Sequence, residues 1–180
     1  MSLVQRMTFL VFAILLIAAV VGCNPMAQYT GDGKLIDNGP SAATDRYVLD
    51  LGSIPLKTPA STTFKLANLP KEEFVIGIEI RLPASSGGKI DPGSINPVVS
   101  LVLLGEDGKA LITKEGKLSD WTWSIHSPGN YAFVYGRGES GTYFTPVPGK
   151  RYELMLKVKE PDRSTVSYTS SLVAKSGGWK

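Results

Sequence analysis

The sequence predicts an all-β domain, an antiparallel β-sandwich or jelly roll of eight to nine strands, and three observations support this prediction. Apolar residues recur at every second position through short segments, as in strands with one buried face. The 19 Gly and 12 Pro of the 180 residues separate these segments, at a spacing of roughly ten residues. No segment of the body has the apolar repeat of an amphipathic helix. We therefore expect the sandwich at 46–180.

The clearest strand is expected at 74–82, where five apolar side chains would line one face. A hairpin is expected after the strand at 99–103, because Asp107-Gly108 tolerates the positive φ angles that a tight turn requires. The other predicted strands are, in chain order, 47–51, 110–113, 121–125, 131–135, 152–158 and 165–173. A body of about 135 residues is ample for a two-sheet core, so it needs neither a disulfide nor a structural metal.

The first 22 residues have the pattern of a secretory signal peptide. A positive N-terminal region with Arg6 precedes an apolar run of 15 residues from Met7 to Val21. As a helix this run would rise roughly 22 Å, which falls short of the ~30 Å hydrocarbon core of a bilayer. We therefore expect the signal peptide 1–22 to be cleaved, with an uncleaved membrane anchor as the alternative.

The apolar run ends in Val20-Val21-Gly22-Cys23, which resembles the lipobox of bacterial lipoproteins. In that family the cysteine thiol receives a diacylglycerol, the leader is cut before the cysteine, and the new amine is acylated with a fatty chain such as palmitate. The resemblance implies these roles for Cys23 and a membrane partner through the N-terminal lipid. Cys23 is the only cysteine, so the alternatives are a free or buried thiol and an intermolecular disulfide.

The residue after the cysteine is Asn24, whereas lipoproteins kept at the inner membrane usually carry Asp there. The resemblance therefore implies a lipid-anchored protein of the cell envelope, at the outer membrane and facing the periplasm if the source has two membranes. Small and polar residues dominate 23–45, without strand or helix periodicity. We expect this segment to be a lipidated flexible tether.

Composition and motifs exclude several functions. A net charge of +3, from 19 Lys+Arg and 16 Asp+Glu, is too small and dispersed for nucleic-acid binding. The single histidine, His126, excludes a multi-histidine metal centre, and we expect it in an exposed or turn-flanking position. EF-hand, Gly-x-Ser-x-Gly and Walker patterns are absent. We expect no catalytic residue, cofactor or metal, although a hydrolase pair of distant carboxylates, such as Asp50 with Asp120, stays open.

Trp121 and Trp123 are the candidate ligand platform, because residues i and i+2 of a strand share a face. Two indoles side by side can stack on a sugar or an apolar partner, or they can belong to the core. A three-residue turn, 128–130, would place Trp123 opposite Tyr135 and gather six large side chains on one face. A four-residue turn would place Trp123 opposite Val134 and divide the aromatic residues between two faces. The sequence leaves both registers open. The first favours burial of both indoles, and burial is the expectation.

The function expected from these features is a non-enzymatic, lipid-anchored envelope protein whose sandwich binds or scaffolds an envelope partner, preferably a protein. The segment 121–133 resembles, only at the level of pattern, small jelly-roll domains of carbohydrate-binding or adhesive type. A carbohydrate- or peptidoglycan-binding module is therefore the alternative, and it requires Trp121 and Trp123 to face solvent in a groove. An envelope hydrolase is the further alternative, and it requires two carboxylates, or His126 with a serine, to meet in one cleft.

Overall fold

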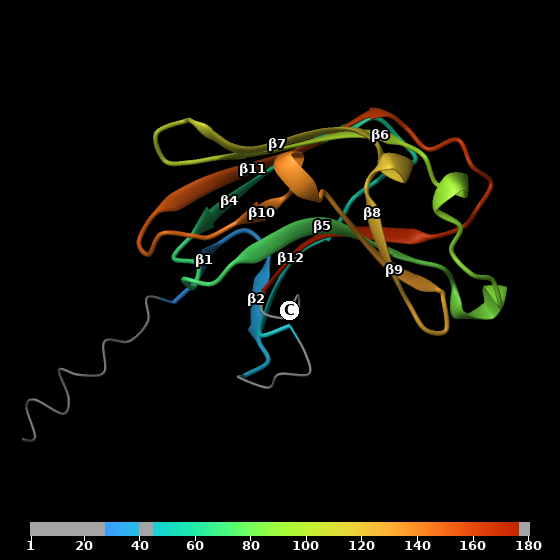
Figure 1. Cartoon of the computed structure of the whole chain (residues 1–180), viewed down its shortest axis with the longest axis horizontal. Coiled ribbons are helices and arrows are strands. Elements are labelled where there is room, and N and C mark those ends of the chain that lie inside the picture. The colour runs from blue at the N-terminus through green and yellow to red at the C-terminus, as the bar shows by residue number, and fades with distance from the viewer. Residues whose placement is uncertain (1–27, 40–44, 177–180) are drawn as a thin grey trace, which may run out of the picture.

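The computed structural model describes residues 28–39 and 45–176, and it has the all-β sandwich architecture that the sequence predicts (Figure 1). The leader, Cys23 and Trp179 lie outside the described residues. The strands are β1 (Thr30–Gly31), β2 (Lys34–Asp37), β3 (Tyr47–Ser53), β4 (Ala60–Ala67), β5 (Phe74–Arg81), β6 (Val98–Leu104), β7 (Ala110–Lys117), β8 (Thr122–His126), β9 (Tyr131–Tyr135), β10 (Tyr143–Phe144), β11 (Arg151–Glu160) and β12 (Thr169–Ser176).

Helical structure in the described ranges is confined to four short 3-10 turns. None of them is long and apolar enough to span a bilayer. They are η1 (Ala84–Ser86), η2 (Pro92–Ser94), η3 (Leu118–Asp120) and η4 (Gly138–Ser140).

Two antiparallel sheets form the layers of the sandwich, as Figure 1 shows. The five-stranded sheet has the order β1-β4-β11-β6-β7. The seven-stranded sheet has the order β2-β3-β12-β5-β9-β8, with β10 paired to the start of β5. β1, β2, β4 and β10 are not among the strands expected from the sequence. In β4 the alternation is weak, because only Phe64 and Leu66 supply large apolar side chains.

The core lies between the two sheets and is built from alternate side chains of their strands. Isoleucines of β5 and leucines of β6 and β11 are fully buried there, and they are Ile76, Ile78, Ile80, Leu101, Leu103 and Leu154. Burying a side chain of this size contributes about 1.5–3 kcal/mol before conformational entropy is subtracted. Because neighbouring residues of a strand point to opposite faces, this burial fixes the register of each strand.

β5 is buried on both faces, which the sequence does not predict. Its outward-facing residues Val75, Gly77 and Glu79 are buried, like the isoleucines between them. The ring of Phe133, on the neighbouring β9, lies over Gly77. A Cβ atom at residue 77 would come within 2.5 Å of that ring and of the Val134 carbonyl oxygen. Glycine is therefore required at this position for Phe133 to cover β5.

The prediction of a flexible tether at 23–45 is wrong over part of that segment, because β1 pairs with β4 and β2 pairs with β3. Asp32 fixes this segment on β4. Its N–H donates to the Lys65 carbonyl oxygen at 2.8 Å, and its carboxylate accepts from the Lys65 N–H at 2.7 Å. Gly31, with a φ of 150°, packs so closely against the Lys65 carbonyl that a side chain would clash. This glycine, expected to be part of a linker, is a close-contact residue.

β12 begins at Thr169 rather than at the expected residue 165, because Asp162 holds the preceding residues in an irregular loop. The buried carboxylate of Asp162 accepts hydrogen bonds from the Ser164 hydroxyl at 2.6 Å and the Tyr168 hydroxyl at 2.8 Å. Burial acts to raise the pKa of Asp162, but these hydrogen bonds outweigh it and hold the pKa below its ordinary value of 3.8. The loop therefore keeps an ionised acceptor at its centre.

We predict that Gly77→Ala destabilises the fold by about 1–3 kcal/mol, because the added methyl group must displace the Phe133 ring or β9. Gly93→Ala is the matched control, since the nearest atom to a Cβ there is an Asp91 carboxylate oxygen at 3.5 Å. Urea unfolding of both variants measures the difference. Equal stability of the two variants would contradict the packing described for β5.

Candidate functional site on the outer face of the seven-stranded sheet

The β8–β9 hairpin turns through four residues, 127–130, which is the second of the two registers that the sequence leaves open. Trp123 is paired with Val134, as the alternative register requires. The last two carbonyl oxygens of the turn accept hydrogen bonds from N–H groups of the segment 82–90. Contacts with a distant part of the chain therefore hold the longer turn.

The two tryptophans pack as core residues in this register. Trp121 is 5% exposed and belongs to the main core. Trp123 is half-buried against that core, and its Nε1 donates to the Leu118 carbonyl oxygen at 3.0 Å. The expectation of burial is confirmed for Trp121. The pair does not form the solvent-facing platform that the glycan-binding alternative requires.

The same register places the aromatic residues of β9 on the outer face of the seven-stranded sheet. There Phe133 and Tyr135 form a second apolar cluster with Val75 and Val173, and Tyr143 packs against it. The rings of Phe133 and Tyr135 are stacked with centroids 5.5 Å apart. The outer face is therefore partly apolar, although it faces away from the sandwich core.

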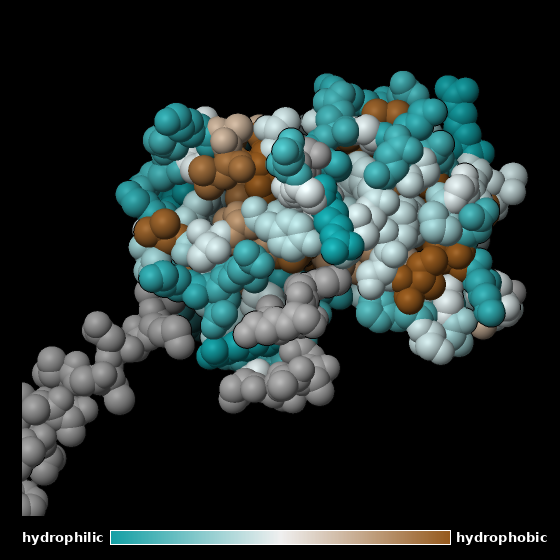
Figure 2. Space-filling view, viewed as in Figure 1, coloured by the Kyte–Doolittle hydropathy of each residue, from teal (hydrophilic) through white to brown (hydrophobic). Residues whose placement is uncertain are grey.

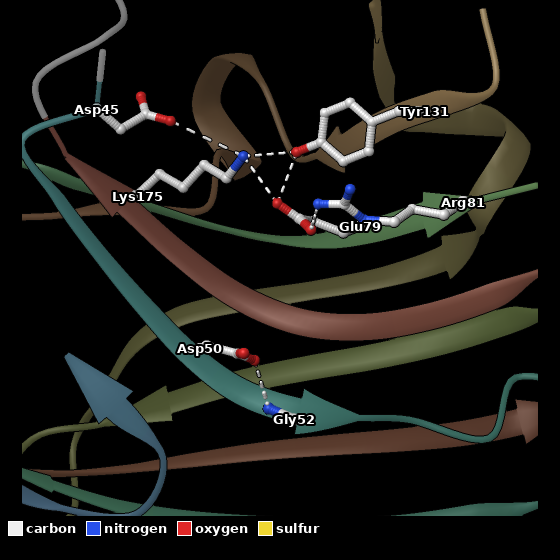
Figure 3. A network of polar contacts seen from close by, with 7 residues as sticks. All are labelled: Asp45, Asp50, Gly52, Glu79, Arg81, Tyr131 and Lys175. Carbon is white, nitrogen blue, oxygen red and sulfur yellow. Dashed lines mark hydrogen bonds and ion pairs between the residues drawn. The ribbon is translucent and has the colours of Figure 1, made fainter. Parts of the chain in front are cut away.

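Beside this cluster lies a network of charged residues on the same face (Figure 3). Glu79 Oε1 accepts hydrogen bonds from the Tyr131 hydroxyl at 2.6 Å and from Lys175 Nζ at 2.9 Å. Glu79 Oε2 accepts from the Arg81 guanidinium at 2.9 Å. Lys175 Nζ also donates to the Tyr131 hydroxyl at 2.7 Å and lies 3.8 Å from Asp45. Two carboxylates and two cations thus form one network, in which Glu79 and Lys175 both contact the Tyr131 hydroxyl.

Hydrogen bonds keep the buried part of this network ionised. Burial acts to raise the pKa of Glu79, but the bonds from Tyr131 and Lys175 hold it below its ordinary value of 4.5. Burial acts to lower the pKa of Lys175, but its bonds to Tyr131 and Glu79 raise it above 10.5. Burial raises the pKa of Asp45 at the edge of the network, and the Lys175 charge offsets this only in part. Glu79 and Lys175 therefore form an ion pair at neutral pH while each is 8% exposed.

The exposed part of the site is a rim made of Arg81, His126 and Tyr131, which we call the Arg81 rim. Arg81 and His126 are each paired with Tyr131 across the sheet. The Arg81 guanidinium lies 4.5 Å from the centre of the Tyr131 ring, and the His126 ring centre lies 4.9 Å from it. His126 is exposed and borders the turn, as predicted, whereas Ile125, paired with Ala132, lies on the opposite face of the sheet.

Exposed apolar surface is scattered on the side of the molecule in view. Figure 2 shows separate brown patches divided by polar residues rather than one continuous apolar face. The rim combines an arginine, a tyrosine and a histidine, so it too is a mixed surface. Mixed surfaces of this composition are typical of protein–protein interfaces.

The site is better suited to binding than to proton transfer, because a carboxylate held by three donors is a poor general base. Asp50 lies apart from the network and accepts from the Gly52 N–H at 2.9 Å (Figure 3). Asp120 precedes β8, four strand spacings from β3 or roughly 19 Å, so Asp50 and Asp120 do not form a glycosidase pair. No group of three or more metal-ligating side chains occurs in 28–39 and 45–176.

No protein-family model matches this chain, and no curated protein matches it. Function is therefore inferred from the sequence motifs and the geometry of the site. Cys23, the proposed lipid attachment residue, lies outside the described residues.

The sequence analysis does not identify Glu79, Tyr131 and Lys175 as a group, because a single sequence does not reveal that β5 lies between β12 and β9. One local signal is present. Glu79 is a carboxylate within a strand of otherwise apolar residues, and a charged side chain in such a strand is expected to be paired if it is buried.

We predict that Lys175→Met destabilises the protein by about 3 kcal/mol, because it leaves the buried Glu79 carboxylate with one cation instead of two. Lys159→Met is the matched control. It removes a lysine from an ion pair with Glu115 that is largely open to solvent, so its stability should hardly change. Chemical unfolding near neutral pH compares the variants, and equal losses would contradict the network's role.

Proposed function

We propose that this chain is a lipid-anchored protein of the bacterial cell envelope whose β-sandwich binds a protein partner and catalyses no reaction. The observation that carries the proposal is the segment Met7–Cys23, an apolar run of signal-peptide length that ends in a lipobox-like tetrapeptide. Asn24 favours the outer membrane, with the domain facing the periplasm, if the source has two membranes.

The chemistry of Cys23 supports stable anchoring. A thiolate is the side-chain nucleophile best suited to forming a thioether with a diacylglycerol. With an acylated amine the residue would carry three fatty chains. At about 0.8 kcal/mol per buried CH₂, these exceed what stable membrane attachment requires.

The Arg81 rim supports a protein partner rather than a glycan. Arginine and tyrosine are enriched among residues that dominate binding energy at protein interfaces. Glu79 already holds Arg81 and Tyr131 in place, so little side-chain entropy is lost when a partner binds. The Tyr131 ring is flanked by Arg81, His126 and Lys175, whose contacts leave little of the ring for stacking on a sugar.

We predict that Cys23→Ser abolishes incorporation of labelled palmitate when the full chain is produced in a bacterium. The reason is that serine does not form the thioether on which leader cleavage and N-acylation depend in lipoproteins. Ala27→Ser, which makes a similarly small change four residues further along, should label as the wild type does. Equal labelling of both variants, or no labelling of the wild type, would overturn the anchor.

We further predict that a photo-reactive amino acid at residue 126 forms a discrete protein adduct in intact cells, because His126 lies on the Arg81 rim. The same probe at residue 157, exposed on the other sheet, is the matched control. Adding Arg81→Glu should reduce the adduct several-fold, since it removes a central cation of the rim. An adduct that is equal at both sites, or unaffected by Arg81→Glu, would overturn the assignment of this face.

A further inference from the structure

We propose that the end of the sandwich where β1 begins rests on the membrane, with the loop around Val147 inserted among the lipid headgroups. This inference rests on the proposed lipid anchor at Cys23. It assigns an orientation to the domain and a bilayer surface as the occupant of this end.

Only a short length of chain separates the proposed anchor from the fold. Thr30, the first residue of β1, follows Cys23 by seven residues, which span at most about 25 Å when fully extended. The tether expected at 23–45 would have reached about three times as far. The end of the domain that carries β1 is therefore confined to the neighbourhood of the bilayer.

β1 is firmly attached at this end of the sandwich. Asp32 bonds twice with Lys65, and the Tyr29 hydroxyl donates to the Asp32 carbonyl oxygen at 2.6 Å. The Asn68 side chain donates to the Thr30 hydroxyl at 3.3 Å. The entry point is thus part of the folded body, so an anchor at Cys23 would hold the domain by this end.

Two loops lie beside the point where the chain enters the fold. A groove of about 530 Å³ is lined on one side by Thr30 and on another by Glu106 and Arg151, so the turn at 105–109 lies close to β1. Glu106 bonds to Lys150 at 2.9 Å and to Arg151 at 3.3 Å, which joins this turn to the loop at 145–150. The groove thus brings the start of β1 together with two loops at one end of the molecule.

The two most exposed large apolar side chains of the described residues lie in the loop at 145–150 and at the start of β7, and they are Val147 at 56% and Leu111 at 52%. The backbone at Val147 is tied to β11, because its N–H donates to the Tyr152 hydroxyl at 2.7 Å. Leu111 lies beside the other turn, with its Cδ1 3.7 Å from the position of a Cβ on Gly105. Both apolar groups therefore lie at the end that the anchor keeps near the lipid.

The charges around Val147 suit an interface between water and lipid. Lys150 and Arg151, with side chains 55% and 78% exposed, share the single carboxylate of Glu106. Long cationic side chains beside an apolar tip can lie among phosphate headgroups while the tip enters the acyl boundary. One exposed valine would not hold a free protein on a membrane, but the anchor raises its effective concentration at the bilayer greatly.

The test uses the full lipidated chain, in which an added cysteine is the only free thiol once Cys23 is acylated. Val147→Cys and the control Ala84→Cys, exposed in η1 at the opposite end of β5, each receive an environment-sensitive fluorophore. Both proteins are reconstituted into vesicles of phosphatidylethanolamine and phosphatidylglycerol that contain a nitroxide lipid. We expect several-fold stronger quenching at residue 147 than at residue 84.

A second measurement separates insertion from mere proximity. A fluorophore at Lys109→Cys should be quenched in the otherwise unchanged chain and several-fold less when Val147→Asp is added. Equal quenching at residues 147 and 84, or no effect of Val147→Asp, would overturn the orientation while labelled palmitate on Cys23 leaves the anchor intact. Shielding of residue 147 from an aqueous quencher without quenching by the lipid would indicate a protein on this end, and would also overturn it.

Discussion

The burial of β5 on both faces is the constraint on which the rest of the structure depends. Its isoleucines face the core, while Gly77 accommodates the Phe133 ring and Glu79 holds the charged network on the other face. Because alternate residues serve two clusters, a shift by one residue would turn the Glu79 carboxylate into the core. The register that builds the core therefore also positions Arg81 and Tyr131 on the proposed binding surface.

The sequence predicts the strands whose own alternation is strong, and β5, β6 and β11 are found where it places them. It does not predict elements that depend on distant partners. β1 forms because Asp32 meets the backbone of Lys65, and the β8–β9 turn has four residues because the segment 82–90 bonds to it. The charged network is not predicted for the same reason. Glu79, Tyr131 and Lys175 come from three strands that only the fold brings together.

The two ends of β5 relate the proposed anchor to the proposed binding surface. β5 begins beside β10, near the loops proposed to rest on lipid, and ends at Arg81. Eight residues of strand span about 26 Å. A domain held at the bilayer by its β1 end would thus present the Arg81 rim away from the membrane, where a second envelope protein can reach it. The buried ion pair beneath the rim keeps that surface rigid.

The chemical state of Cys23 decides the central claim, because location, orientation and partner class all follow from it. Mass spectrometry of the N-terminal peptide of the mature protein, isolated from membranes of a bacterial host, measures that state directly. The account predicts a chain that begins at Cys23, with a thioether-linked diacylglycerol and an acylated amine. A chain that still begins at Met1, or one with an unmodified Cys23 thiol, would contradict it.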